Sequence, residues 1–231
     1  MGSTQTAATR FRLSSTGTPS LSPAFDASWE QTGSVTRLIM LAGQKDGSAL
    51  TNFTGTVPIT TTQDILVAQF VSAPFSYRTR ILGTCSMVIR DSESAGTANA
   101  HLAYSLRSYR PSTSAFQALA SNFATQTEDG TTASTRIWSA QALTATTVEP
   151  GDVLVFEVGI HAAAPTAATS AVRRFGMPAG VADFALTSGL TTDLCPWLEI
   201  QSEVLQSVGL ENFQSMKVPD GYGTSAVWRP S

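Results

Sequence analysis

Apolar and polar residues alternate with a period of two along most of this chain, and clusters of Gly, Pro, Ser and Thr interrupt the alternation. A β-strand places successive side chains on opposite faces, so this pattern indicates many short, half-buried strands. It predicts an all-β protein: an antiparallel β-sandwich of the jelly-roll type with extended terminal arms and at most one short helix. The expected strands are Thr9 to Leu13, Val35 to Leu41, Asp64 to Val71, Thr79 to Arg90, Ala100 to Tyr109, Thr135 to Trp138, Asp152 to His161, Val172 to Phe175 and Pro196 to Ser202.

Two local patterns refine this prediction. In the segment 100–109, Leu102, Tyr104 and Leu106 share one face, and polar residues including His101 and Arg107 share the other, which predicts a strand with one face in water. The sequence Glu149-Pro150-Gly151-Asp152 predicts a turn before a strong central strand, because proline fixes a negative φ and glycine accepts a positive one.

The segment Ser114 to Asn122 differs from the rest. Phe116, Leu119 and Phe123 stand at helical spacing behind a serine that can cap a helix, so we expect the single short helix here. We divide the chain into an N-terminal arm over residues 1–8, a β-sandwich over 9–202 and a C-terminal arm over 203–231. The C-terminal arm carries isolated aromatic residues, which need a surface to lie on, either its own domain or a neighbouring subunit.

Charged residues make up only 13% of the chain, about half of the usual share, and lysine occurs only at Lys45 and Lys217. Thr, Ser and Ala together account for 88 of the 231 residues, so small neutral side chains form much of the predicted surface. Such side chains lose little entropy on packing, which suits contacts in an assembly. An alternative explanation is that these Ser and Thr residues only cover the solvent-facing sides of strands, in a chain from a compositionally biased genome.

Charge and hydropathy exclude several classes of partner. The formal net charge is -3, which lacks the basic excess of a nucleic-acid-binding protein. No run of 18 apolar residues is present, so we expect no membrane partner. No secretory signal precedes the domain, so we expect a cytoplasmic site of synthesis.

Cys85 and Cys195 lie on apolar segments without metal-ligand spacing, and we expect two buried free thiols.

The sequence contains no GxSxG, HExxH, Walker or EF-hand motif, and it predicts no cofactor, no metal and no enzyme activity. His101 and His161 are expected to face solvent. Three carboxylate pairs, at 26 and 30, at 91 and 93 and at 128 and 129, are expected in solvated turns with ordinary pKa values. Calcium could be held by Asp91, Glu93 or Asp183, and the sequence does not select one.

Aromatic residues beside Ser, Thr and Arg are the remaining candidates for recognition. Each could instead be an ordinary core or rim residue. The candidate binding residues, for a subunit contact or a glycan, are Phe11, Trp29, Tyr109, Trp138, Tyr222 and Trp228.

Several segments resemble structural proteins of tailed bacteriophages, over most of residues 10–200. The matching segments are residues 10–15, 22–26, 29–33, 69–72 with Pro74, 89–90 with 93–94, 101–107, 151–152 and 196–199. The resemblance implies a jelly-roll virion component on the capsid or the tail, and it assigns no functional residue.

Together these observations predict a non-enzymatic virion structural protein, assembled in the host cytoplasm. Its favoured role is capsid decoration, with other virion proteins as partners and a homo-oligomeric state. An alternative is a carbohydrate-binding tail or head-spike module that recognises a host-surface glycan. A third possibility is a hydrolase that uses paired carboxylates.

Overall fold

The computed structural model describes residues 6–32, 35–58, 61–123 and 127–204. Within these residues the chain forms β-strands and no helix, which confirms the all-β prediction. The strands are β1 (Thr6–Leu13), β2 (Thr36–Ala42), β3 (Thr51–Val57), β4 (Gln63–Ser72), β5 (Thr79–Glu93), β6 (Ala100–Arg110), β7 (Ala115–Asn122), β8 (Ser134–Ala142), β9 (Thr146–Val148), β10 (Val153–Ala162), β11 (Thr169–Phe175) and β12 (Trp197–Val204).

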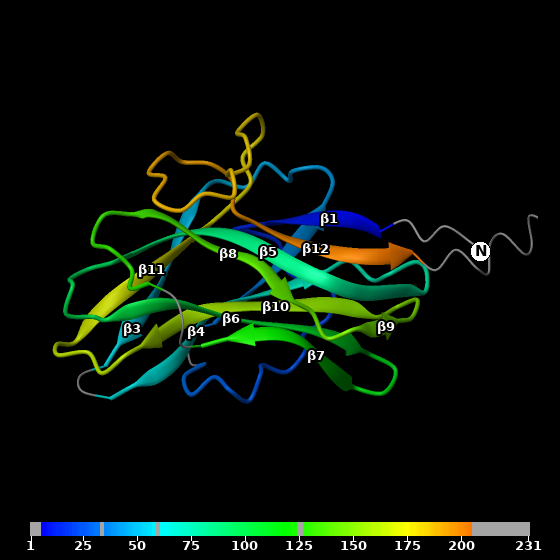
Figure 1. Ribbon diagram of the computed structural model, residues 1–231, viewed down its shortest axis with the longest axis horizontal. Coiled ribbons are helices and arrows are strands. Elements are labelled where there is room, and N and C mark those ends of the chain that lie inside the picture. Colours follow the sequence, from blue (N-terminus) through cyan, green and yellow to red (C-terminus); the bar gives the residue numbers. More distant parts are fainter. Residues whose placement is uncertain (1–5, 33–34, 59–60, 124–126, 205–231) are drawn as a thin grey trace, which may run out of the picture.

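All of these strands belong to one hydrogen-bonded sheet (Figure 1). Its strand order is β3-β11-β5-β12-β1-β2-β4-β10-β6-β7, and β8 and β9 pair with β5. Neighbouring strands are antiparallel except β2 and β4, which run parallel. The nine predicted strands are confirmed, and β3, β7 and β9 are additional.

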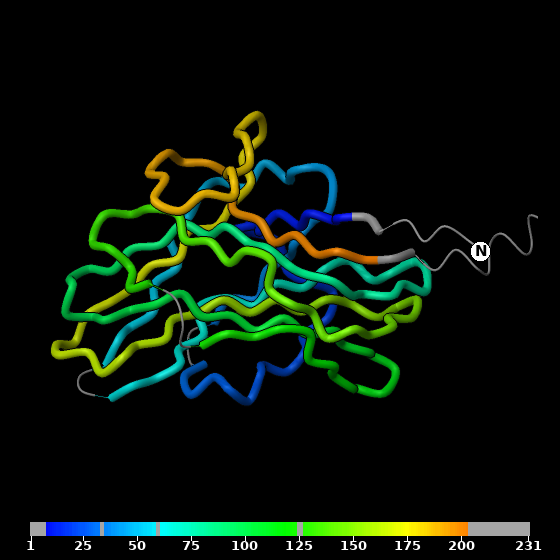
Figure 2. Tube along the Cα trace, viewed as in Figure 1, coloured from blue at the N-terminus to red at the C-terminus, as the bar shows by residue number. Residues whose placement is uncertain are grey.

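The sheet curls so that strands far apart in its order share one core. Met87 of β5 and Leu198 of β12 belong to the same buried cluster as Phe70 of β4, Phe156 of β10 and Leu106 of β6. In the trace of Figure 2, β1, β12 and β5 lie on one side of this core and β4, β10, β6 and β7 lie on the other. The curl buries apolar faces that a flat sheet would leave in water.

The predicted helix at 114–122 is wrong, because this segment is the strand β7. It forms an antiparallel hairpin with β6, in which Ala115 pairs with Arg110. Phe116 and Leu119 are three residues apart, which in a strand puts them on opposite faces. Phe116 packs outside the sheet and Leu119 packs in the main core, so both are used without a helix.

The face of β6 that was predicted to be wet is covered, which corrects a second expectation. Arg107 is 7% exposed and donates a hydrogen bond of 2.8 Å to Glu157 of β10, which is fully buried. Gln69 of β4 donates to the same carboxylate at 2.9 Å. Residues 23–29 of the connection between β1 and β2 lie over these groups, and the main-chain N–H of Asp26 also donates to Glu157. A buried charge is tolerated here because several donors surround it.

Two smaller predictions are confirmed. The turn before β10 closes with a hydrogen bond of 3.0 Å from Asp152 N to Glu149 O, and Gly151 has a φ of 93°. Cys85 and Cys195 are buried free thiols. Among the residues that the structure describes, none forms a helix of the length and hydropathy that crossing a bilayer requires.

Candidate functional site

Several strands begin or end together at one end of the domain, which we call the open end (on the right in Figure 1). The connections 73–78 and 149–152 meet there. The main-chain N–H of Phe75 donates to the carbonyl of Asp152 at 2.8 Å, and that of Gly151 donates to the carbonyl of Phe75 at 2.9 Å. This pairing fixes the two connections to each other, and a cavity lies beside each of them.

The larger cavity is an apolar groove of about 340 Å³, which we call the Tyr77 groove. Its lining consists of Thr9, Phe11, residues 40–42, residues 72–77 and Thr79. No charged residue is among them. The volume lies within the range of small-molecule and side-chain pockets, roughly 300–1,000 Å³.

The groove is an extension of the main core, because core side chains of β1 and β2 also form part of its lining. Phe11 and Met40 belong to the main core, and residues of the connection 73–78 line the groove together with them. Phe75 packs partly on this core, whereas the side chain of Tyr77 is 73% exposed. A ring this exposed on the rim of an apolar cavity gains contact area when a second apolar group enters.

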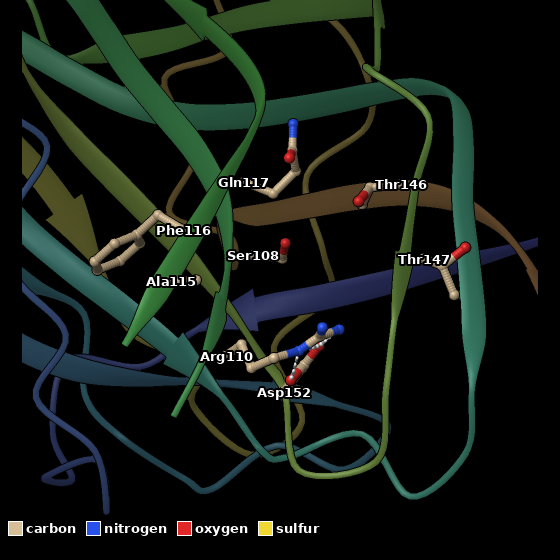
Figure 3. Close-up of a pocket in the computed structure, with 8 residues that line it drawn as sticks. All are labelled: Ser108, Arg110, Ala115, Phe116, Gln117, Thr146, Thr147 and Asp152. Carbon is tan, nitrogen blue, oxygen red and sulfur yellow. Dashed lines mark hydrogen bonds and ion pairs between the residues drawn. The ribbon is translucent and has the colours of Figure 1, made fainter. Parts of the chain in front are cut away.

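The second cavity, of about 170 Å³, lies between the β6–β7 hairpin and β9 (Figure 3). Ser108, Gln117 and Thr146 surround it together with an ion pair between Arg110 and Asp152. Arg110 Nη2 lies 2.9 Å from Asp152 Oδ2, and Arg110 Nε donates to both carboxylate oxygens. The hydrogen bond with Asp152 raises the pKa of Arg110.

The polar cavity is the weaker candidate. Asp152 already accepts from Arg110 and from the main-chain N–H of Glu149, so this ion pair satisfies itself. A ligand there would have to compete with these bonds, and the cavity is smaller than most ligand pockets. The Tyr77 groove offers more apolar area and has no internal pairing to disrupt.

A buried carboxyl pair lies elsewhere in the domain. Asp91 at the end of β5 and Asp129 are each 2% exposed, and Arg173 Nη1 donates to Asp129 Oδ2 at 2.6 Å. Burial raises the pKa of Asp91 well above its usual value, and the charge of Asp129 raises it further. The prediction of solvated turns is therefore wrong for Asp91, Glu93 and Asp129, which are all buried, and Asp91 does not have the ordinary pKa that was predicted for it. Burial also raises the pKa of Glu93.

The structure also places the remaining titratable candidates. His161 and Asp64 are cross-strand partners, with 2.7 Å between Nδ1 and Oδ1, and His161 is only partly exposed. Asp183 forms ion pairs with Arg12 and Lys45. Among the described residues, no group of three or more His, Cys, Asp or Glu side chains could hold a metal ion.

The predicted aromatic residues are dispersed. Phe11 lines the Tyr77 groove, but Trp29 and Trp138 are each only 5% exposed and pack in clusters of the interior. Tyr109 stacks on Phe116 on the outer face, with ring centroids 4.7 Å apart. Tyr222 and Trp228 lie outside the described residues.

Sequence reasoning missed most of the groove. Leu41 and Phe75 carry no motif, and they meet only because β2 runs parallel to β4 and the chain then turns after Ser72. One signal was present. The segment Ala73-Pro74-Phe75-Ser76-Tyr77 places two aromatic residues in a short connection between two strands, where rings are seldom needed for a core.

Comparison with known proteins finds no matching family model and no matching curated protein. Among solved structures, the chain is similar to a CocE/NonD family hydrolase from Staphylococcus aureus, with a TM-score of 0.42 and 9% identity over 86% of this chain and 36% of that one. A second structure of a CocE/NonD family hydrolase from that organism gives a TM-score of 0.40 and 9% identity over 71% and 34%. An α-amino acid ester hydrolase gives 0.36 and 10% over 83% and 35%. The chain thus spans about a third of the length of these structures.

These comparisons contradict the functional prediction. The three proteins are described as hydrolases, and none of them is described as a phage protein. The predictions of a non-enzymatic virion structural protein and of a carbohydrate-binding tail or head-spike module are therefore wrong by this comparison. The physical reason is that strand alternation and a low charge content determine which side chains are buried and which face solvent. They do not determine function, because domains of unrelated function share both features. At 9–10% identity, no residue role or activity is carried from those hydrolases to this chain.

Proposed function

We propose that this domain binds an aromatic side chain of a peptide in the Tyr77 groove, at the open end of a sandwich of the jelly-roll type. The observation that carries the proposal is an uncharged cavity of about 340 Å³ with a tyrosine 73% exposed on its rim. A charged ligand would lose its hydration there without gaining a partner. An apolar ring loses little and gains contacts on several sides.

The expected affinity is modest. An aromatic side chain buries about 150–250 Å². At about 25 cal/mol per Å², this area contributes roughly 4–6 kcal/mol before the cost of association is subtracted. A single free ring should therefore bind weakly, and a peptide that places one ring in the groove should bind more tightly through its flanking contacts.

A titration with N-acetyl-tryptophanamide, followed by amide chemical shifts of the full chain, tests this function. We expect shifts at residues 9–11, 40–42 and 72–79, and we expect Tyr77→Ala to weaken binding about three- to tenfold, the usual contribution of one aromatic pair. Leu186→Ala is the matched control, because Leu186 is 42% exposed and lies outside the groove. Shifts confined to other surfaces, or equal effects of the two substitutions, contradict the proposal.

A further inference from the structure

The last described strand, β12, ends next to a residue that lines the Tyr77 groove. β12 ends at Val204, whose partner in the sheet is Thr79 of β5, and Thr79 lines the groove. β1, which contributes Thr9 and Phe11 to the lining, is the other neighbour of β12. Residues 205–231 lie outside the part of the chain that the structure describes, and they follow directly on Val204 in the sequence.

The reach of that segment is ample. Trp228 is 24 residues beyond Val204. An extended chain of this length spans up to roughly 80 Å. A chain of this length is long enough for Trp228 to reach a groove that is lined by Thr79, the sheet partner of Val204.

The chemistry of the segment matches that of the groove. Residues 205–231 hold two acidic and two basic residues, and the stretch from Gly221 to Trp228 holds none. That stretch contains Tyr222, Val227 and Trp228 beside small neutral residues. An uncharged groove with an exposed ring on its rim accepts an uncharged aromatic segment at the lowest desolvation cost.

We infer that the occupant of the Tyr77 groove is the C-terminal segment of the same chain, with Trp228 as the inserted ring and Tyr222 beside it. This inference rests on the proposed function, because it names the peptide that the groove binds. Tethering makes the contact intramolecular, so a ring that binds weakly when free occupies the groove for much of the time. An external peptide then has to displace the segment.

The first experiment compares N-acetyl-tryptophanamide binding by the wild-type chain and by the full-length double variant Tyr222→Ala, Trp228→Ala. Removing the competing rings is expected to tighten probe binding at least threefold. The variant Thr224→Ala, which leaves both rings in place, is expected to bind like the wild type. A synthetic peptide of residues 218–231 added to the double variant is expected to compete with the probe.

The possible outcomes separate the two claims. If neither protein shows probe-induced shifts at residues 72–79, the proposed function fails. If both proteins bind the probe there with equal affinity, the function stands and the inference about the C-terminal segment is overturned. If the difference between them disappears on dilution, the segment is supplied by a second copy of the chain, which overturns the arrangement within one chain.

A second experiment observes the ring directly. The chain is labelled with 5-fluorotryptophan, and the ¹⁹F resonance of Trp228 is assigned by its loss in Trp228→Phe. Three of the four tryptophans, Trp29, Trp138 and Trp197, are buried and serve as internal references. Tyr77→Ala is expected to move the Trp228 resonance and Leu186→Ala to leave it in place. A Trp228 resonance at the position of free tryptophan in the wild type overturns the inference.

Discussion

Trp29 Nε1 donates a hydrogen bond of 2.8 Å to Oε2 of Glu157, a carboxylate with no solvent exposure. The contact ties the connection between β1 and β2 to the outer face of β10. The same connection places its indole ring against Gly159, two residues further along the strand.

Glu157→Gln is expected to lower the free energy of unfolding by about 3 kcal/mol, because it leaves the buried guanidinium of Arg107 short of a counter-charge. The amide also presents hydrogen atoms to donors such as Trp29 Nε1. Urea unfolding measures the change. The control is Glu149→Gln, whose ion pair with Arg78 is exposed and contributes about 0–1 kcal/mol. A loss no greater than that of the control would show that the buried network is dispensable.

Gly159→Ala is expected to destabilise the fold by more than about 3 kcal/mol, at the upper end of single-residue effects. A methyl group there would overlap the carbonyl oxygen of Ile65 and the ring of Trp29. Gly96→Ala is the control, since a methyl group at that position would lie an ordinary 3.7 Å from Oε1 of Glu93. Thermal unfolding of the two variants should therefore differ clearly, and similar midpoints would contradict the close packing of Trp29 on β10.

Asp91→Asn is expected to become increasingly stabilising, relative to the wild type, as pH rises above the ordinary carboxyl pKa of 3.8. Burial raises the pKa of Asp91, so the folded protein holds a proton that the unfolded chain releases, and wild-type stability declines through this interval. Asparagine carries no such proton. Unfolding free energies measured across pH give the difference directly.

The control for this pH series is Asp193→Asn, whose side chain is 48% exposed. Between pH 6 and pH 9, the effect on unfolding free energy is expected to depend more strongly on pH for Asp91→Asn than for this control. If Asp91→Asn behaved in the same way as this control, the carboxyl of Asp91 would be ionised in the folded state at neutral pH, contrary to our interpretation of its burial.

Both thiols are expected to react slowly with a disulfide reagent in the folded state. Burial raises the pKa of Cys85 to about 11 and also raises that of Cys195, so little thiolate is present at pH 8. The urea-unfolded chain should release two equivalents rapidly. Rapid reaction of one equivalent in the absence of urea would show that a thiol is accessible in the native protein.

The sequence predicted the strands well, because a period of two is a local signal that tertiary contacts seldom override. β10 was recognised by a different local signal, the continuous run of Val, Leu and Phe residues after Gly151 that is typical of a buried central strand. The β7 segment shows the limit, since Phe116 and Leu119 fit a helix and a strand equally well until β6 is beside them.

The candidate site was far less accessible to sequence reasoning. Phe11 was named, but the groove also needs Leu41 and Tyr77, which come from segments that the fold brings together through the parallel pairing of β2 and β4. The burial of Asp91 was missed for a related reason. Ile89, Asp91 and Glu93 continue one face of β5, and the charged residues were assigned to a turn because of their type.

The pairing of Thr6 with Glu203 places the first and last described strands side by side, and both lead out at the same end of the sheet. A mechanical load applied between Thr6 and Val204 would therefore act on the hydrogen bonds of β1 and β12 one pair after another, and not on all of them at once. Pulling in this zipper direction should separate the two strands at low force. A load applied between the two ends of the long strand β5 should require a much higher unfolding force.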